Sequence, residues 1–162
     1  APQRESVSTQ MPGEYGGNLD IKDLVAGSLL HLPVAVEGAL LCMGDIHAVQ
    51  GDGETVICAL EMSGEITVKV DVLADRQEIP TPFIVTPSHY LTTAASPSLD
   101  DCSIRAAQKM HRFLRQHSAL TDAQCGMLLS LAGNLRISQV VNPSKGCIME
   151  FPISLAQETF VK

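Results

Sequence analysis

The sequence predicts an α+β fold, with a β-rich N-terminal part of sandwich or barrel-like hairpins followed by a helix-helix-strand-strand segment. Apolar residues alternate with polar ones along much of the chain before residue 96 and recur at helical spacing after it. Strands and helices in separate stretches are typical of α+β folds, whereas a doubly wound α/β sheet alternates them. A chain of 162 residues with 45 % hydrophobic content can bury a core of its own.

Composition divides the chain into three segments. Residues 1–17 are rich in Pro, Gly, Ser and Gln and lack periodicity, so we expect an irregular arm. Residues 18–95 form a β-rich lobe that carries an acidic and histidine-containing motif, and residues 96–162 form an α/β lobe.

Alternation places the strands of the β-rich lobe. Residues 30–36 alternate, with Pro33 indicating a sheet edge or a bulge. The clearest hairpin joins 56–62 to 66–72 through a turn at Ser63-Gly64. A loop-like stretch with three prolines then precedes a strand at 89–95.

Capping signals place two helices in the third segment. Ser98 and Asp101 resemble a capping box, and an apolar stripe predicts a helix from 99 to 117. Thr121 and Gln124 repeat the signal and open a second helix that ends near Gly133. Two strands follow, at 135–141 and 147–153.

Charge and hydropathy exclude several classes of protein. The net charge of −7 argues against a nucleic-acid partner, whose phosphates require a basic patch. The apolar runs are shorter than the roughly 18 to 20 residues of a membrane span, and the N-terminus does not resemble a signal peptide, so we expect a cytoplasmic protein without membrane contact. The basic residues Arg105, Lys109, Arg112 and Arg115 recur at helical spacing and predict a solvated helix face.

The five cysteines contain no Cys-x-x-Cys pair, which fits neither a disulfide framework nor a thiolate zinc site. We therefore expect most of them to be buried free thiols.

The most informative stretch is 44–54, which combines three carboxylates, one imidazole, one amide and three glycines within eleven residues. Asp45 and His47 are two apart and project to one face of an extended chain, and Glu54 returns to that face after the turn at 51–53. Such a cluster can hold a divalent metal or a reactive water. From the residues alone, turn formation by Asp52-Gly53 and a packed, satisfied histidine are favoured over a functional cluster.

Several segments around this motif resemble the acetamidase/formamidase family. The resemblance extends in order over most of the chain, from residue 12 to 153. It is carried by Gly16-Gly17-Asn18-Leu19-Asp20, Leu32-Pro33-Val34, Glu37-Gly38-Ala39, Gly44-Asp45 to Glu54, Val140-Val141-Asn142-Pro143 and Lys145-Gly146.

The resemblance implies hydrolysis of short amides such as formamide and acetamide, a β-rich fold and a bound divalent metal. Family members are about twice as long, and the match corresponds to their C-terminal half. Ile46 and Val49 stand where the family more often has small residues, so they are expected to narrow or reshape the pocket.

Amide hydrolysis requires an activated nucleophile, a stabilised oxyanion and a protonated leaving nitrogen. We assign Asp20, Asp45 and His47 as metal ligands and Glu54 as the general base, with Asp45 and Glu54 able to exchange these roles. Zinc is the first choice of metal, with calcium and manganese as alternatives. Substrate-binding groups are Asn18, Gln50, Gly51 and Gly53.

Two alternatives remain. Cys42, three residues before Asp45, is a candidate nucleophile, although its apolar surroundings predict packing. The second alternative is that the chain is a non-catalytic metal-binding half or partner subunit of a split or processed amidase. Since a half-length chain exposes strand edges, we expect either a homo-oligomer or pairing with a missing N-terminal half.

Overall fold

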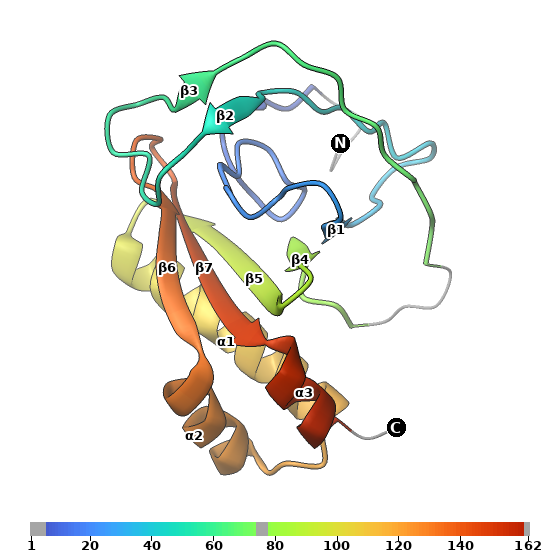
Figure 1. Cartoon of the computed structure of the whole chain (residues 1–162), viewed down its shortest axis with the longest axis vertical. Helices are drawn as coiled ribbons and strands as arrows, with labels where there is room; N and C mark the ends of the chain where they lie inside the picture. Colours follow the sequence, from blue (N-terminus) through green and yellow to red (C-terminus); the bar gives the residue numbers. More distant parts are fainter. Residues whose placement is uncertain (1–5, 74–77, 161–162) are drawn as a thin grey trace.

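The computed structural model describes residues 6–73 and 78–160 and shows a five-stranded antiparallel sheet covered by helices on one face (Figure 1). In spatial order the strands are β1 (Leu29–His31), β4 (Phe83–Val85), β5 (His89–Ser96), β7 (Lys145–Pro152) and β6 (Asn134–Gln139). A separate two-stranded ribbon pairs β2 (His47–Val49) with β3 (Leu60–Glu61). The helices are α1 (Leu99–His117), α2 (Asp122–Ala132) and α3 (Ile153–Thr159). The α+β class is therefore confirmed.

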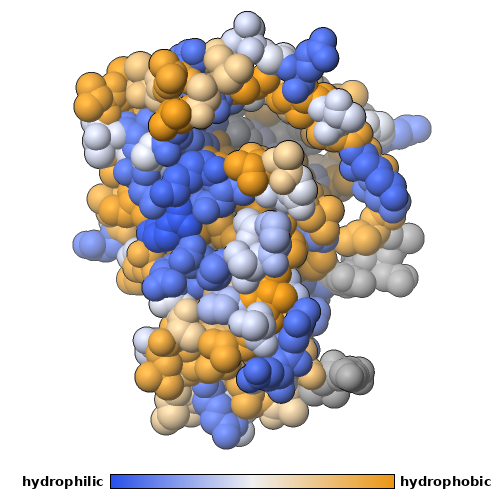
Figure 2. Space-filling view, in the orientation of Figure 1, coloured by the Kyte–Doolittle hydropathy of each residue, from blue (hydrophilic) through white to orange (hydrophobic). Residues whose placement is uncertain are grey.

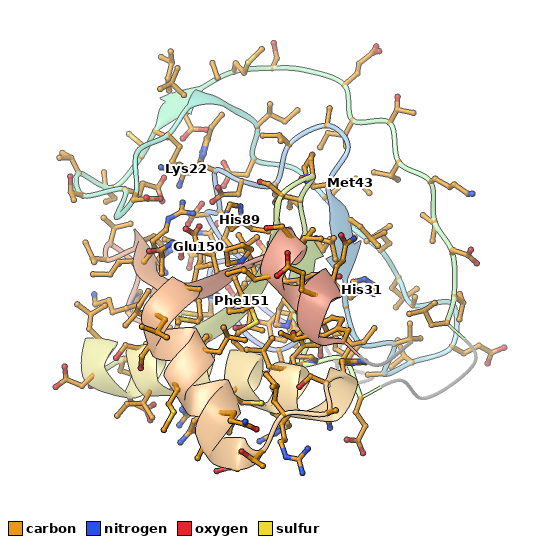
Figure 3. The ribbon with its side chains drawn as sticks, turned by 60° about the horizontal axis from the view of Figure 1, so that its bottom comes forward. Lys22, His31, Met43, His89, Glu150 and Phe151 are labelled. Carbon is orange, nitrogen blue, oxygen red and sulfur yellow. The ribbon has the colours of Figure 1, made fainter. Side chains whose placement is uncertain are left out.

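Alternation along β7 explains how the two faces of the sheet differ. Met149 and Phe151 belong to the larger apolar cluster with residues of α1, whereas Ile148 packs with Ile21 on the opposite face. Figure 3 shows Phe151 close to the helices and its neighbour Glu150 nearer to Lys22. The face opposite the helices is thus free to receive the N-terminal loops and the ribbon.

Local signals fix the helices where the sequence predicts them. Ser98 Oγ accepts a hydrogen bond from the Asp101 amide at 3.3 Å, and α1 covers the predicted residues 99–117. Thr121 and Gln124 form the expected capping box of α2. The short helix α3 was not predicted, because it follows Pro152 without a side-chain cap.

The strand predictions in the third segment are confirmed with small shifts in bounds. The strand predicted at 89–95 is β5, and those predicted at 135–141 and 147–153 are β6 and β7, which begin one or two residues earlier. The sheet combines strands from both sides of the predicted boundary at residue 96, since β5 pairs with β7 from the third segment. The boundary itself stays a prediction.

The hairpin predicted from 56–62 to 66–72 is wrong. β3 contains only Leu60 and Glu61, and it pairs with β2, with Glu61 opposite His47. Residues 65–73 run extended and exposed and, among the described residues, belong to no sheet. Alternating side chains predict an extended chain, but they do not identify the strand with which it pairs.

One further expectation is confirmed and two need correction. Most of the cysteines are buried free thiols, as predicted, since three of the five are buried and Cys42 and Cys58 are exposed. The strand predicted at 30–36 ends at His31, two residues before Pro33, whose nitrogen cannot donate to a ladder. Lys109 does not lie on a solvated face: its side chain is 15 % exposed and its amine binds Glu14.

None of the helices in the described part of the chain is both long enough and apolar enough to cross a membrane.

Candidate functional site

The loop that follows β2 is fastened to the end of β6, where Figure 1 shows the two meeting. The Gly53 amide donates to Ser138 O at 3.0 Å, and the Val140 amide donates to Gly53 O at 3.0 Å. Gly53 has a φ of +91°, a conformation that favours glycine. These bonds place Glu54 beside the five-stranded sheet, where its side chain is buried at 8 % residue exposure.

Arg136 on β6 ties three segments together around the site. Its guanidinium donates to Asp52 at 3.1 and 2.8 Å, to Asp23 at 3.3 and 2.8 Å and to Glu150 at 2.6 Å. Lys22 Nζ lies 3.0 Å from Asp52 as well. Since Asp23 follows Asp20 by three residues and Asp52 precedes Glu54 by two, this network positions both loops that carry candidate site residues.

The two loops bring Asp20, His47 and Glu54 together. One ligand atom from each of these residues lies within 4.8 Å of the others. Asn18 Nδ2 donates to Asp20 Oδ2 at 2.8 Å. Gln50 Nε2 donates to Asp20 O at 3.2 Å, and Gln50 Oε1 faces His47 Nδ1 at 3.5 Å. We call Asp20, His47 and Glu54 the inner triad.

His47 also belongs to a second group, on its more exposed side. His47 Nε2 lies 3.3 Å from Asp45 Oδ1 and 3.0 Å from Glu61 Oε1. The side chains of Asp45 and Glu61 are 50 % and 53 % exposed, against 10 % for His47. The predicted ligands Asp20 and Asp45 therefore fall into different groups that share His47.

The electrostatics of the inner triad favour one shared proton between its two carboxyls. Burial, the charge of Asp20 and a hydrogen bond with Asp20 raise the pKa of Glu54 to about 7. Burial also raises the pKa of Asp20 above its usual range. Burial alone would lower the pKa of His47, but the bond with Gln50 and the charges of Asp45 and Glu61 raise it. Near neutral pH, the two carboxyls and the imidazole of the inner triad are therefore protonated to a greater extent than the same side chains would be in water.

The backbone is strained at the acidic residues of the site. Asp20, Asp45 and Glu54 have φ angles of 48°, 64° and 40°, in the left-handed region that non-glycine residues seldom adopt. Strain of this kind is concentrated at functional sites, where the surrounding structure enforces it. Here the bonds of Arg136 to Asp23 and Asp52 and those of Gly53 hold the segments that carry Asp20 and Glu54.

Beside Glu54, a depression of about 200 Å³ opens to solvent. Its walls include Gln50, Gly51 and Glu54, together with the exposed thiol residue Cys58. The candidate thiol nucleophile of the sequence, Cys42, is exposed rather than packed in an apolar run. Of the predicted substrate-binding residues, Gly53 uses its amide for Ser138, and Asn18 and Gln50 hold Asp20.

Sequence reasoning missed two residues beside the predicted ones. Glu61 was expected to face outward on a different hairpin, and only its pairing with the strand of His47 brings it to the imidazole. Asn142 Nδ2 lies 3.5 Å from Asp20 Oδ2, although the two are 122 positions apart. The segment of Asn142 is part of the family resemblance, which was the available signal.

The donor set suits a divalent metal. Carboxylate oxygens and one imidazole nitrogen are ligands that Zn²⁺ and Mn²⁺ accept. Because Gln50 Nε2 is engaged with Asp20 O, Gln50 Oε1 accepts from His47 Nδ1 and leaves Nε2 facing the carboxylates. An outer partner of this kind commonly orients a metal-binding histidine. Exposed acidic groups of this kind are also common without a metal.

Comparison with known proteins gives consistent matches. The acetamidase/formamidase family matches residues 2–157. The chain is 46 % identical over 72 residues to a formamidase of Methylophilus methylotrophus, covering 44 % of this chain and 18 % of that protein. It is 47 % identical over 75 residues to an acetamidase of Mycolicibacterium smegmatis, covering 46 % of this chain and 18 % of that protein.

Solved structures extend the similarity to the whole chain. A crystal structure of an acetamidase from Bacillus halodurans superposes with a TM-score of 0.94 at 41 % identity, covering 99 % of this chain and 54 % of that chain. An acetamidase from Yersinia enterocolitica gives a TM-score of 0.91 at 29 % identity, covering 96 % of this chain and 47 % of that chain. This chain spans about half the length of these solved relatives. With the family match extending over nearly all of its residues, the chain belongs to the acetamidase/formamidase family.

Proposed function

We propose that this chain carries the hydrolytic site of an amidase that cleaves short linear amides of the formamide or acetamide type and releases ammonia. The observation that carries the proposal is the inner triad, in which a buried carboxyl with a pKa of about 7 lies beside an imidazole and a second carboxyl. A pKa near neutrality lets one group both accept and donate a proton at working pH. The relatives named formamidase and acetamidase supply the substrate class.

Glu54 is the proposed general base. In its deprotonated form it takes a proton from the attacking water, and it then returns that proton to the departing amide nitrogen. Asp20 shares this proton with Glu54, and hydrogen bonds from Asn18 and Gln50 hold Asp20 in place. Burial of Glu54 beside Asp20 therefore tunes the proton transfer rather than merely filling space.

Asp20 and His47 are the proposed metal ligands, with Asp45 as the third and zinc as the first choice of metal. Bound there, a divalent cation would supply a lowered pKa of water and polarisation of a carbonyl oxygen. Asp45 and Glu61 both face His47 Nε2, so this second group is available to complete the ligand set. The earlier alternative, with Asp45 as base and Glu54 as ligand, is less favoured because Asp45 is exposed while Glu54 is buried.

The depression beside Glu54 is the proposed substrate pocket. Its small size fits a short amide, and Gln50 on its wall has a second amide N–H besides the one that binds Asp20 O, which can bind the substrate. The Gly51 backbone lies on the same wall and is a proposed part of the oxyanion site. Val49, which also lines the depression, adds apolar bulk that favours a short acyl group.

A second candidate function is a metal-binding half without catalysis of its own. It is favoured by the share of the solved relatives that this chain leaves uncovered. In this case the inner triad binds a metal that holds the two loops together.

The test is ammonia release from formamide and acetamide by the purified chain, as isolated, after chelation, and after addition of Zn²⁺ or Mn²⁺. Glu54→Gln is expected to lower release by about 10²- to 10⁴-fold while zinc binding, measured by calorimetry, persists. Glu37→Gln, at an exposed position outside the site, is the matched control and is expected to keep full activity. Unchanged release in Glu54→Gln would rule out the general-base role, and metal binding without any release would favour the second candidate.

A further inference from the structure

Residues 140–144, here called the β6–β7 loop, join the last two strands at the end of the sheet that borders the inner triad. The Val140 amide donates to Gly53 O at 3.0 Å, in the loop that follows β2. The Asn142 side chain reaches the other site loop, where its Nδ2 donates to Asp20 Oδ2 at 3.5 Å. Figure 2 shows hydrophilic residues gathered over the upper parts of β6 and β7, below the ribbon. The β6–β7 loop therefore contacts both segments that carry the acids of the inner triad.

Two side chains that flank the β6–β7 loop fix the backbone of Asn142. The Asn142 amide donates to Gln139 Oε1 at 3.1 Å, and Lys145 Nζ donates to Asn142 O at 2.8 Å. Lys145 Nζ also donates to Val140 O at 2.6 Å. Gln139 Nε2 donates to Ser144 O at 2.7 Å, and Gln139 is fully buried, so losing these bonds would leave its amide unsatisfied. The loop itself therefore sets the position of Asn142, independently of the contact with the inner triad.

Gly146 allows the two strands to come close enough for this arrangement. It pairs with Gln139 across β6 and β7. A Cβ at Gly146 would overlap Ser138 Oγ, so a larger residue would push the strands apart at the base of the loop. The consecutive pair Lys145-Gly146 thus supplies both the amine that holds the loop and the close approach of the strands that carry it.

Asp20 receives two side-chain amides on the same carboxylate oxygen. Asn18 Nδ2 donates to Asp20 Oδ2 at 2.8 Å from two residues away in the sequence, and Asn142 donates to this oxygen from 122 residues away. Neither amide is bonded to Oδ1, which stays available to His47 and Glu54. A carboxylate held by one donor can still turn about that bond, whereas donors from two different segments fix its rotation. The orientation of Asp20 thus depends on the β6–β7 loop as well as on its own neighbour.

We propose that Asn142 is a positioning residue for Asp20, and that Lys145 acts on the site through Asn142. The bond from Asn142 to Asp20 is long for an N–H···O contact, so a small displacement of the loop breaks it. The charged amine of Lys145 makes the stronger bonds that prevent this displacement. An outer amide of this kind keeps a ligand carboxylate turned toward a metal ion. The inference thus rests on the proposed role of Asp20 as a metal ligand.

The first test reads the geometry in the metal-free chain by NMR. In the parent chain we expect a nuclear Overhauser contact between the Asn142 side-chain amide and the β-protons of Asp20. Lys145→Met is expected to remove this contact, and Lys145→Arg, which keeps a cationic donor, is expected to retain it. Lys69→Met, at an exposed position outside the loop, is the matched control and should leave the contact intact. A contact that is absent from the parent chain, or that persists in Lys145→Met, would overturn the proposal.

The second test measures zinc affinity by calorimetry in a double-mutant cycle. Asn142→Leu and Lys145→Met are each expected to lower the affinity by about tenfold. Because Lys145 acts through Asn142, the double variant should lose no more than about twofold beyond Asn142→Leu alone. Asn134→Leu removes an amide bond of 2.9 Å to Glu150 at the other end of β6, and as the matched control it should keep the parent affinity.

Two outcomes of the cycle would contradict the proposal. They are an unchanged zinc affinity in Asn142→Leu, and losses that multiply to about a hundredfold in the double variant, as they would if Lys145 only stabilised the fold. Failure of the proposed function is recognised separately, because a parent chain that binds no zinc or releases no ammonia contradicts the metal site or the amidase. In that case the NMR contact and its dependence on Lys145 decide the positioning role by themselves.

Discussion

Arg136 and Asp52 are joined by two hydrogen bonds of 3.1 and 2.8 Å, which fasten the loop carrying Glu54 to the edge strand β6. The pairing with Arg136 holds the pKa of Asp52 below its usual range. Two loops that are remote in sequence meet at this one guanidinium, because Asp23 binds it as well. The geometry of the candidate site therefore depends on a residue that is not part of the inner triad.

Replacing Arg136 tests this dependence. Arg136→Met leaves three partly buried carboxylates without their common partner, so the free energy of unfolding is expected to fall by about 2–4 kcal/mol. Chemical denaturation measures the change. Arg105→Met, which removes an exposed pair with Asp101 on α1, should leave stability almost unchanged, and equal losses in both variants would refute a special role for Arg136.

The shared proton of the inner triad predicts how stability varies with pH. The folded chain holds the Glu54 proton more tightly than the unfolded chain, so this stabilisation is complete below pH 4.5 and is lost as the pH rises through about 7. Between pH 4.5 and about 7, the free energy of unfolding of the parent chain is expected to fall. In the metal-free Glu54→Gln variant this fall should be smaller by about 1–3 kcal/mol. Denaturation at several pH values measures it, with Glu37→Gln as control; parallel curves for parent and Glu54→Gln would contradict the shared proton.

Gln50 is expected to act as a positioning residue for the proposed metal site. Gln50→Leu removes the partners of His47 Nδ1 and of the Asp20 carbonyl, so zinc affinity should fall by about 10- to 100-fold. Calorimetric titration with Zn²⁺ gives the affinity, and Gln108→Leu on the exposed side of α1 is the control. Unaltered affinity in Gln50→Leu would show that His47 does not need this bond to bind metal.

The core beneath the sheet makes a separate prediction. Phe151 is fully buried in the larger apolar cluster, and Phe151→Ala should cost about 3–5 kcal/mol of unfolding free energy through the cavity it leaves. Leu131→Ala, at an 85 % exposed position, is expected to change stability by less than about 0.5 kcal/mol. Thermal and chemical denaturation of the two variants compare them directly, and similar losses would place Phe151 outside the stabilising core.

Zinc itself should stabilise the folded chain. At about 100 times the dissociation constant, a ligand that binds only the folded state adds about 2.7 kcal/mol. His47→Ala removes the imidazole common to both groups and should abolish the gain, whereas His89→Ala, with its side chain on β5, should retain it. A rise in midpoint temperature that persists in His47→Ala would place the metal elsewhere.

The sequence by itself determined the two longer helices α1 and α2, the later strands and the three residues of the inner triad. Ser98 and Thr121 are local signals that act within a few residues, so α1 and α2 begin where their caps predict. The concentration of acids around His47, with the segment that contains Asp20, identified the candidate site and the family through residue type and order alone.

Only the tertiary structure decided which segments meet. Alternation between 56 and 72 indicated extended chain, but pairing with β2 instead of self-pairing brought Glu61 to His47 and left residues 65–73 exposed. The division of the acids into two groups around one imidazole, and the bonds of Arg136 to both site loops, also join residues distant in sequence. Periodicity constrains the conformation of a segment, whereas its partner is selected by the packing of the whole chain, and that selection is absent from any local pattern.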